Sequence, residues 1–287
     1  MQENSPHRGL SNMQKKLDGK KVSAQILGKL KQELVDKKLK LTLGIILVGD
    51  DEWSRVYIKQ KKEAGAEIGV DVKIFEYPAN ISVRKLRAEV SQIAKRHDIN
   101  GLIVQLHLPD ELKAHEQRIL NTIPLNKDVD VLSERAVGKL TAGVSPVIPP
   151  TIAGILRLLE EYKIDISGKH IAIIGNGPLV GRPAEAILTN MRYMGPITLI
   201  TWDAQKYAEH IAQADIVISG VSKSPNLIQA NMLKEGAIVI DAAGNLDHQA
   251  IPKTSFYTPK IGGVGPMTVA MLFFNLIALH KQNKKTA

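Results

Sequence analysis

The chain has 287 residues, of which 44% are hydrophobic and 23% charged, and its formal net charge is +9. This length favours two domains with a core in each, and the composition excludes a disordered chain. Aromatic residues make up only 4%, too few for a base-stacking platform, so the positive charge suits small anionic ligands better than nucleic acid.

Other features of composition narrow the class of protein. The absence of cysteine rules out disulfides and thiolate metal sites and fits a reducing compartment. The eight histidines show no metal-ligand spacing, so no metal is expected. The polar amino terminus lacks the apolar core of a signal peptide, and we expect no apolar run long enough to span a bilayer. We therefore expect a cytoplasmic protein that begins with a flexible tail over residues 1–12.

The first half of the chain alternates helical and strand patterns. The expected elements, in order, are a helix from Val22, a buried strand over 41–48, a helix over Ser54–Gly69, a strand over 71–78, a helix from Val83 and a strand over Gly101–Pro109. This β-α-β-α-β order after the first helix predicts a parallel sheet, whose ligands bind beyond the carboxyl ends of the strands.

Tyr57 and Lys61 are the key pair in the helix over Ser54–Gly69. Four residues apart, they lie on one helix face, so a phenol and an ammonium can address one ligand. A lysine shielded from water and from carboxylates has a lowered pKa, which makes it usable as an acid or base near neutrality. The alternative is an ordinary solvated face, since other lysines and glutamates surround the pair.

Further polar residues are expected near the same sheet edge. Asp50, Gln105 and His107 lie at the ends of strands, although the residue pattern alone favours Gln105 as a polar residue that caps a loop. Lys127, Asp128 and Asp130 stand on a loop, where two acids beside a lysine also fit a turn held by local bonds.

A second α/β unit follows a boundary near residues 145–150, where three prolines interrupt regular structure, and a linking helix over 151–162. A strand then leads into Gly175, Gly177 and Gly181, a glycine turn that opens a helix and lets backbone amides approach a pyrophosphate. The next strand ends in Asp203, about where a dinucleotide site places the acid that binds a ribose hydroxyl. A tight turn with a surface aspartate is the alternative.

The last element is a long apolar helix that returns to pack on the first domain. Glycines 262, 263 and 265 and Pro266 precede it. Thr268 and the glycine amides could line the cleft, although a hinge without a ligand has the same pattern.

Four motifs in collinear order resemble the bifunctional methylenetetrahydrofolate dehydrogenase/methenyltetrahydrofolate cyclohydrolase family. They are VGDDEWSRVYIKQKKEAGAEIGV, VQLHLP where the family has VQLPLP, KDVD, and GGVGPMT. The resemblance runs from about Val22 to the final helix. It implies that methylene-tetrahydrofolate is oxidised with a dinucleotide and that the methenyl product is hydrolysed to formyl-tetrahydrofolate, in one-carbon metabolism that serves purine biosynthesis.

The resemblance also implies roles for single residues. Tyr57 would orient the pterin, Lys61 would be the catalytic lysine, Gln105 would hold and tune it, and Asp130 would bind the polar edge of the pterin. The substrate would also meet the segment before and within the last helix, at Gly262, Gly263, Pro266 and Thr268. The cofactor would meet Gly175, Asn176, Gly177, Val180, Gly181, Asp203 and Ser222.

The chain departs from the family pattern in both domains. In the first, Val131 replaces a glycine, Ala136 an asparagine, and Pro150 and Ile152 the cysteine and proline of P-C-T-P. On the cofactor side, Asn176 and Gly177 replace the arginine and serine of G-R-S, and residues 202–206 replace C-H-S-R-T. NADP is the cofactor by resemblance, but the charge of Asp203 would repel a ribose phosphate, which favours NAD or weakens dinucleotide binding. Lys206 or Lys223 could restore a phosphate contact.

The sequence thus predicts an α/β protein of two domains with a cleft between them. A folate-binding catalytic domain would span 13–150 and be completed by a helix over 266–287, and a Rossmann-like NAD(P)-binding domain would span 151–265. The family implies a homodimer. Two alternatives stay open: an enzyme that keeps only the cyclohydrolase step, and a non-catalytic folate-binding protein on the same scaffold.

Overall fold

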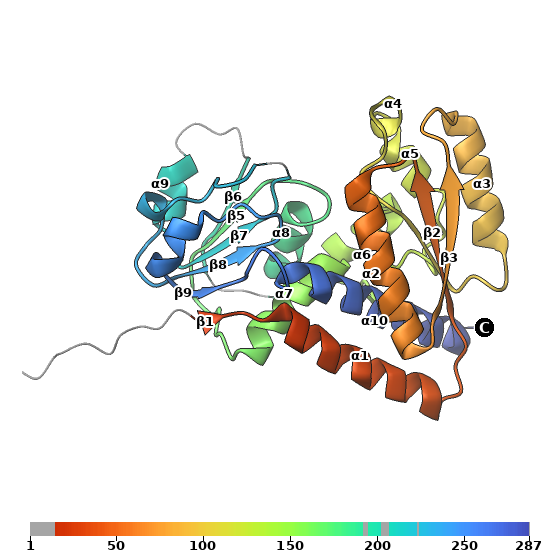
Figure 1. Ribbon diagram of the computed structural model, residues 1–287, viewed down its shortest axis with the longest axis horizontal. Coiled ribbons are helices and arrows are strands. Elements are labelled where there is room, and N and C mark those ends of the chain that lie inside the picture. Colours follow the sequence, from red (N-terminus) through yellow and green to blue (C-terminus); the bar gives the residue numbers. More distant parts are fainter. Residues whose placement is uncertain (1–14, 192–194, 202–206, 223, 287) are drawn as a thin grey trace, which may run out of the picture.

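The computed structural model describes residues 15–191, 195–201, 207–222 and 224–286. Two α/β domains lie side by side, and long helices run along the base of both (Figure 1). The predicted fold class is confirmed by the two parallel sheets. The expected tail over 1–12 lies outside the described residues.

The first domain is built on a parallel three-stranded sheet in the order β3-β2-β4. Its strands are β2 (Thr42–Val48), β3 (Asp71–Tyr77) and β4 (Gly101–Val104), and its main helices are α1 (Gly19–Asp36), α2 (Glu52–Ile68) and α3 (Val83–Lys95). Along β2, Ile45 packs into one apolar cluster and Ile46 into another. Both faces of the central strand are therefore buried, which explains its continuous apolar sequence.

Two details differ from the expectations for this domain. The last strand ends at Val104 rather than Pro109, because the chain leaves β2 after the amide of Gln105 donates to the Ile46 carbonyl. Three short helices were not predicted, since four to eight residues are too few to show a helical period. They are α4 (Asp110–Lys113), α5 (Glu116–Leu120) and α6 (Glu134–Thr141).

The second domain begins after the linking helix α7 (Pro150–Glu161) and has a parallel sheet in the order β1-β9-β8-β7-β5-β6. Its strands are β5 (Ile171–Ile174), β6 (Ile197–Ile200), β7 (Ile216–Ser219), β8 (Ala237–Asp241) and β9 (Thr254–Tyr257), with the helices α8 (Gly181–Asn190) and α9 (Tyr207–Ala212) and the 3-10 turns η1 (Ala230–Met232) and η2 (His248–Lys253).

The edge strand β1 (Lys15–Lys16) comes from the other end of the chain. It pairs in parallel with β9, so residues expected in the first domain extend the sheet of the second. Two exposed lysines carry no strand pattern, and this pairing depends on the tertiary fold alone.

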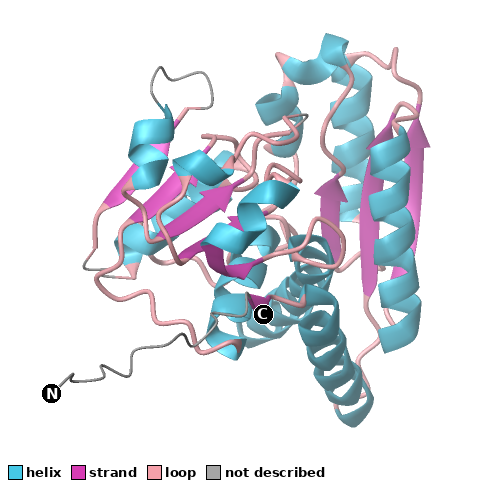
Figure 2. Cartoon of the chain, turned by 60° about the vertical axis from the view of Figure 1, so that its left-hand side comes forward, coloured by secondary structure: helices cyan, strands magenta, loops and turns pink. Residues whose placement is uncertain are grey.

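The last helix, α10 (Val264–Thr286), packs against α7, α1 and α2 and so contacts both the linker and the first domain. Figure 2 shows these long helices gathered beneath the two sheets. Within the described part of the chain, α10 is long and apolar enough to cross a membrane, contrary to the expectation that no such run exists. However, 61% of that apolar window is buried inside the protein, as in the core helix of a soluble domain.

The contact between α7 and α10 provides a test of this packing. A Cβ atom at Gly154 in α7 would lie 2.8 Å from the Met267 Cβ, whereas one at Gly28 in α1 would meet nothing within 4 Å. We expect Gly154→Ala to lower the free energy of unfolding by about 1–3 kcal/mol through overpacking. Gly28→Ala, also within a helix, should raise it by about 0.5–1 kcal/mol. Urea unfolding of the two variants measures both changes, and equal effects would contradict the close helix contact.

Candidate active site

Helix α2 starts directly after β2, so its first turns lie at the carboxyl edge of the first sheet. The Asp51 side chain caps it by accepting from the Ser54 amide at 2.8 Å, and the helix ends at Gly69 with φ +84°. Along one face, the exposed fraction falls from 70% at Trp53 through 36% at Tyr57 to 6% at Lys61. This face therefore runs from the surface into the interior, with the lysine at its deep end.

Lys61 is held by one neutral partner. Its Nζ donates to the Oε1 of Gln105 at 2.8 Å. The Nε2 of Gln105 donates to the Leu106 carbonyl at 2.8 Å, which directs the amide oxygen toward the lysine. The peptide bond between Leu106 and His107 is cis. The structure thus brings together two residues that stand 44 positions apart in the chain.

Burial shifts the pKa values of both Lys61 and Asp130. Burial lowers the pKa of Lys61, and the charge of Asp130 opposes this shift in part. Burial also raises the pKa of Asp130 to about 6, with Lys61 lowering it and Asp128 raising it. Both shifts favour the neutral form of the side chain.

Asp130 stands on a loop that is fixed at its start by Lys127. The Nζ of Lys127 donates to the carbonyls of Ala94 and Arg96, each at 2.8 Å. Its own carbonyl accepts from the Leu102 amide at 2.8 Å. The loop is therefore tied both to the end of α3 and to β4.

The other side of the loop is organised by Asp128. This buried carboxylate accepts from the Leu132 amide at 3.3 Å and the Ser133 amide at 2.9 Å. Val131, which lies between Asp128 and Leu132 in the chain, has φ +60°, a left-handed conformation. The resemblance expects glycine at this position. Asp128 thus makes the local turn that the sequence offered as an alternative, whereas Asp130 interacts with Lys61 through its charge.

The start of α10 faces Tyr57. A Cβ atom at Gly265 would lie 3.9 Å from the Tyr57 hydroxyl oxygen. Gly262 and Gly263 precede the helix, Pro266 is in its first turn, and the Thr268 hydroxyl lies 3.2 Å from the Val264 carbonyl oxygen. Helix α10 starts two residues before the predicted 266 because proline is tolerated in a first turn, where amides need no helical partner.

The glycine turn of the second domain has the close backbone approach that its sequence predicts. Gly175 has φ +92°, and a Cβ atom at Gly181 would lie 1.8 Å from the Gly175 carbonyl oxygen. Val180 makes no side-chain cap to α8, but the Arg182 amide donates to the Gly177 carbonyl at 3.2 Å, and the Ala184 amide donates to the Val180 carbonyl at 2.9 Å. The close backbone approach of Gly175 and Gly181 is the feature of this turn that fits the phosphates of a dinucleotide.

The remaining cofactor candidates surround this turn. Asn176 and Ser222 are exposed, and Gly177 is half-buried. A Cβ atom at Gly175 would lie 3.0 Å from the Val221 side chain, so the residue before Ser222 borders the turn. Asp203, Lys206 and Lys223 lie outside the described residues.

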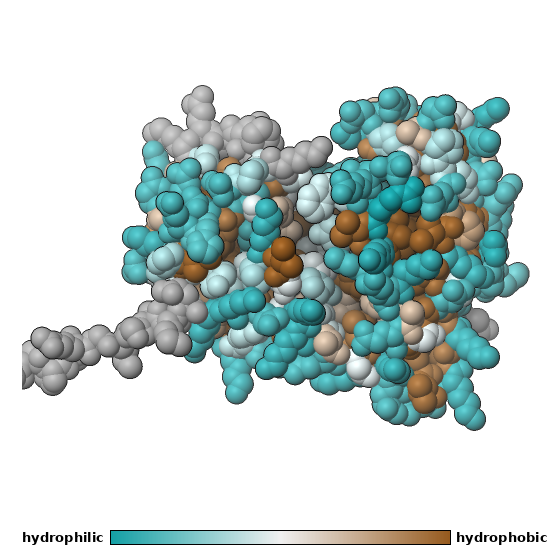
Figure 3. Space-filling model, in the orientation of Figure 1, coloured by the Kyte–Doolittle hydropathy of each residue, from teal (hydrophilic) through white to brown (hydrophobic). Residues whose placement is uncertain are grey.

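One side chain links this turn to the first domain. Leu179 packs against the first domain's cluster that includes Leu106 and Leu132, as well as against the cluster shared by both domains. The glycine turn therefore borders the side of the first domain that carries Gln105 and the Asp130 loop. On the face shown in Figure 3 the surface is hollowed between the two domains.

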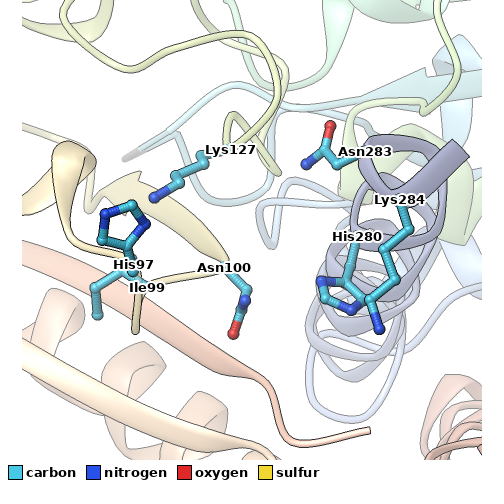
Figure 4. A pocket seen from close by; sticks show the side chains of 7 residues that line it. All are labelled: His97, Ile99, Asn100, Lys127, His280, Asn283 and Lys284. Carbon is cyan, nitrogen blue, oxygen red and sulfur yellow. The ribbon is translucent and has the colours of Figure 1, made fainter. Parts of the chain in front are cut away.

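A separate hollow lies at the amino end of β4, away from Gln105. It is lined by His97, Ile99, Asn100, Lys127, His280, Asn283 and Lys284 (Figure 4). Because ligands of parallel sheets bind at the carboxyl ends of the strands, and Lys127 is already bonded to two carbonyls, this hollow is not the active site. The described residues contain no group of three or more histidines or acids that could hold a metal ion.

Comparison with known proteins agrees with this division into two parts. The catalytic domain of tetrahydrofolate dehydrogenase/cyclohydrolase matches residues 17–130, and the NAD(P)-binding domain of the same family matches residues 149–284. The chain belongs to the tetrahydrofolate dehydrogenase/cyclohydrolase family. The resemblance indicated by the four motifs is thereby confirmed.

Individual members of the tetrahydrofolate dehydrogenase/cyclohydrolase family are similar over nearly the whole chain. The bifunctional protein FolD of Nautilia profundicola is 37% identical in an alignment of 283 positions that covers 94% of this chain and 98% of that protein. A crystal structure of bifunctional FolD from Campylobacter jejuni is 34% identical with a TM-score of 0.85, covering 93% of this chain and 98% of that one. The enzyme from Trypanosoma brucei, complexed with NADP and an inhibitor, is 26% identical with a TM-score of 0.88, covering 95% and 99%.

Sequence reasoning passed over two residues of this site. Trp53 precedes Tyr57 by one turn on the same face of α2, and helical spacing alone could have singled it out. Asn275 is buried in α10 and bonds to the loop that carries Asp130. The only sequence signal for Asn275 is that a single asparagine stands in an apolar helix. This signal does not indicate which residues the asparagine contacts.

The raised pKa of Asp130 makes a prediction about stability. Below its unfolded pKa, near 3.8, the carboxyl is protonated in both states; as pH rises through 6, ionisation costs more in the folded state and stability is lost. Relative to the parent, Asp130→Asn should therefore gain about 1–3 kcal/mol between pH 4 and pH 8, after allowance for the partial exposure of the side chain. Urea unfolding at both pH values measures this gap. A gap that does not change with pH would contradict the raised pKa.

Proposed function

We propose that the chain oxidises methylene-tetrahydrofolate to methenyl-tetrahydrofolate with a nicotinamide dinucleotide and hydrolyses the methenyl product to formyl-tetrahydrofolate. Family membership supports both activities. The observation that carries the proposal is the buried Lys61, bonded to Gln105 at 2.8 Å and lowered in pKa. A protein that only binds folate has little use for a buried, polarised lysine, because burial of a charge costs stability.

The two reactions require that the protein orient the substrate and transfer a proton. The methylene bridge must lose a hydride, and the bound dinucleotide supplies the acceptor. The resulting methenyl carbon is part of a cation and already electrophilic, so the protein needs mainly to place water and move protons. We assign Tyr57 to the face of the pterin, Asp130 to its polar edge, and Lys61 to proton transfer during attack of water. Gln105 keeps the ammonium of Lys61 aimed into the cleft.

The first domain and the start of α10 form the folate side of this assignment. Gly262, Gly263, Pro266 and Thr268 are assigned to the substrate because this segment reaches Tyr57. On the other side, the turn from Gly175 to Gly181 would hold the phosphates of the dinucleotide.

Replacing the lysine tests the assignment. Lys61→Met keeps the length of the side chain and removes its proton, so the rate of methenyl-tetrahydrofolate hydrolysis should fall by about 100-fold or more. Folate affinity should stay within about threefold, since the ring and the polar edge keep their partners. The hydrolysis is followed by absorbance, and binding by calorimetry.

Lys62→Met is the matched control, because the neighbouring lysine is exposed and loses the same charge. Its hydrolysis rate should equal that of the parent. Equal rates for the two variants would overturn the catalytic role of Lys61, and no turnover by the parent itself would leave only a folate-binding protein.

We further propose that NAD is favoured over NADP. Support comes from the sequence: Asn176 stands where the family has arginine, and Asp203 follows β6 where a ribose-binding acid is expected. A carboxylate repels a 2′-phosphate and accepts a bond from a 2′-hydroxyl.

The cofactor preference is measured by methylene-tetrahydrofolate oxidation with each dinucleotide. The parent should have the higher kcat/KM with NAD, and Asp203→Asn should shift the ratio toward NADP by about tenfold. Glu185→Gln, an exposed carboxylate-to-amide change on α8, should leave the ratio unchanged. Strong preference of the parent for NADP would overturn the proposal. Hydrolysis without reduction of either dinucleotide would show that only the cyclohydrolase step remains.

A further inference from the structure

Asn275 is a buried amide whose donors reach two distant loops. Its side chain is 1% exposed, in the middle of the apolar helix α10. The Nδ2 donates to the Val129 carbonyl at 2.9 Å and to the Ile148 carbonyl at 2.7 Å. Both hydrogens of the amide are therefore used, and neither bond belongs to the helix itself.

The first of these bonds acts on Asp130. The carbonyl of Val129 and the amide of Asp130 belong to one planar peptide unit. A bond that fixes this carbonyl therefore fixes the orientation of the peptide that enters Asp130. The side chain of Val129 is also confined, since a Cβ atom at Gly101 would meet its Cγ1 at 2.7 Å and Leu276 at 2.6 Å.

The second bond acts on the chain that enters the linker. Ile148 precedes Pro149 and Pro150, and α7 begins at Pro150. Prolines have no amide hydrogen, so this segment has few donors of its own with which to fix its path. Asn275 therefore joins the Asp130 loop, the beginning of α7 and α10 at one point.

We propose that Asn275 is a positioning residue, which orients the Asp130 carboxylate toward Lys61 and the substrate by holding the Val129–Asp130 peptide. This inference rests on the proposed role of Asp130 in folate binding. Asn275 itself does not touch the substrate. Its effect on the reaction should pass entirely through Asp130.

The test is a double-mutant cycle between the two residues, read in KM and kcat for methenyl-tetrahydrofolate hydrolysis. Asn275→Leu keeps the approximate volume of the side chain and removes both donors. We expect it to raise KM by about tenfold, the loss of one good hydrogen bond, with a smaller change in kcat. In an Asp130→Asn background the same substitution should change KM by less than twofold, because the effect it transmits is already gone.

The helix offers a matched control. The Nδ2 of Asn283, two turns further along α10, donates to the Asn126 carbonyl at 2.9 Å, in the same loop but four residues before Asp130. Asn283→Leu should leave KM within twofold of the parent. If Asn275→Leu does not fold, Asn275→Ser, which is smaller and keeps a hydroxyl donor, is measured in the same cycle with the same expected non-additivity.

The possible outcomes separate the two proposals. A KM that rises equally in the presence and absence of Asp130, or a lower melting temperature with unchanged KM, overturns the positioning role of Asn275. If Asp130→Asn alone leaves KM unchanged, the proposed role of Asp130 fails first. Non-additive KM effects with a silent Asn283→Leu support the inference.

Discussion

Burial of the Lys61 ammonium is the constraint on which this site depends. A buried charge is costly unless it is paired and hydrogen-bonded, and here the hydrogen-bond partner is a neutral amide. The described residues place no carboxylate in contact with its Nζ, and Asp130 acts on it through charge at longer range. The protein thus keeps the lysine buried without stabilising its charged form fully. That balance is what lowers its pKa, and a direct ion pair would remove it.

Several helices, strands and loops hold Lys61, Gln105 and the Asp130 loop in position. Helix α2 starts at the carboxyl end of β2, which sets the lysine above the sheet edge, and Gln105 follows β4 at the same edge. The Asp130 loop approaches from the side, tied down by Lys127 and Asp128. Helix α10 closes the set, because its first turn reaches Tyr57 and its middle holds the Asp130 peptide. One helix therefore contacts both Tyr57 and the loop that carries Asp130.

Much of the fold and part of the site follow from the sequence. The order of helices and strands was predictable because β2 is buried on both faces and α2 has a clear period. The pairing of β1 with β9 was not, since Lys15 and Lys16 have no strand pattern of their own. The expectation that no apolar run could span a membrane overlooked α10, which is long and apolar because it is a core helix packed on several sides. Lys61 and Gln105 could be placed together only through the family resemblance, since no local pattern reports a contact over 44 residues.

The departure at Val131 shows how such a loop tolerates change beside the site. A β-branched residue with a positive φ costs about 1–2 kcal/mol relative to glycine. Its side chain, however, is 1% exposed, and burial of a valine contributes about 1.5–3 kcal/mol. The two effects nearly cancel, so the backbone of the turn persists without glycine. Asp128 fixes the amides that follow Val131, and Asn275 fixes the peptide before Asp130, so the backbone is held by hydrogen bonds on both sides of the residue with the positive φ.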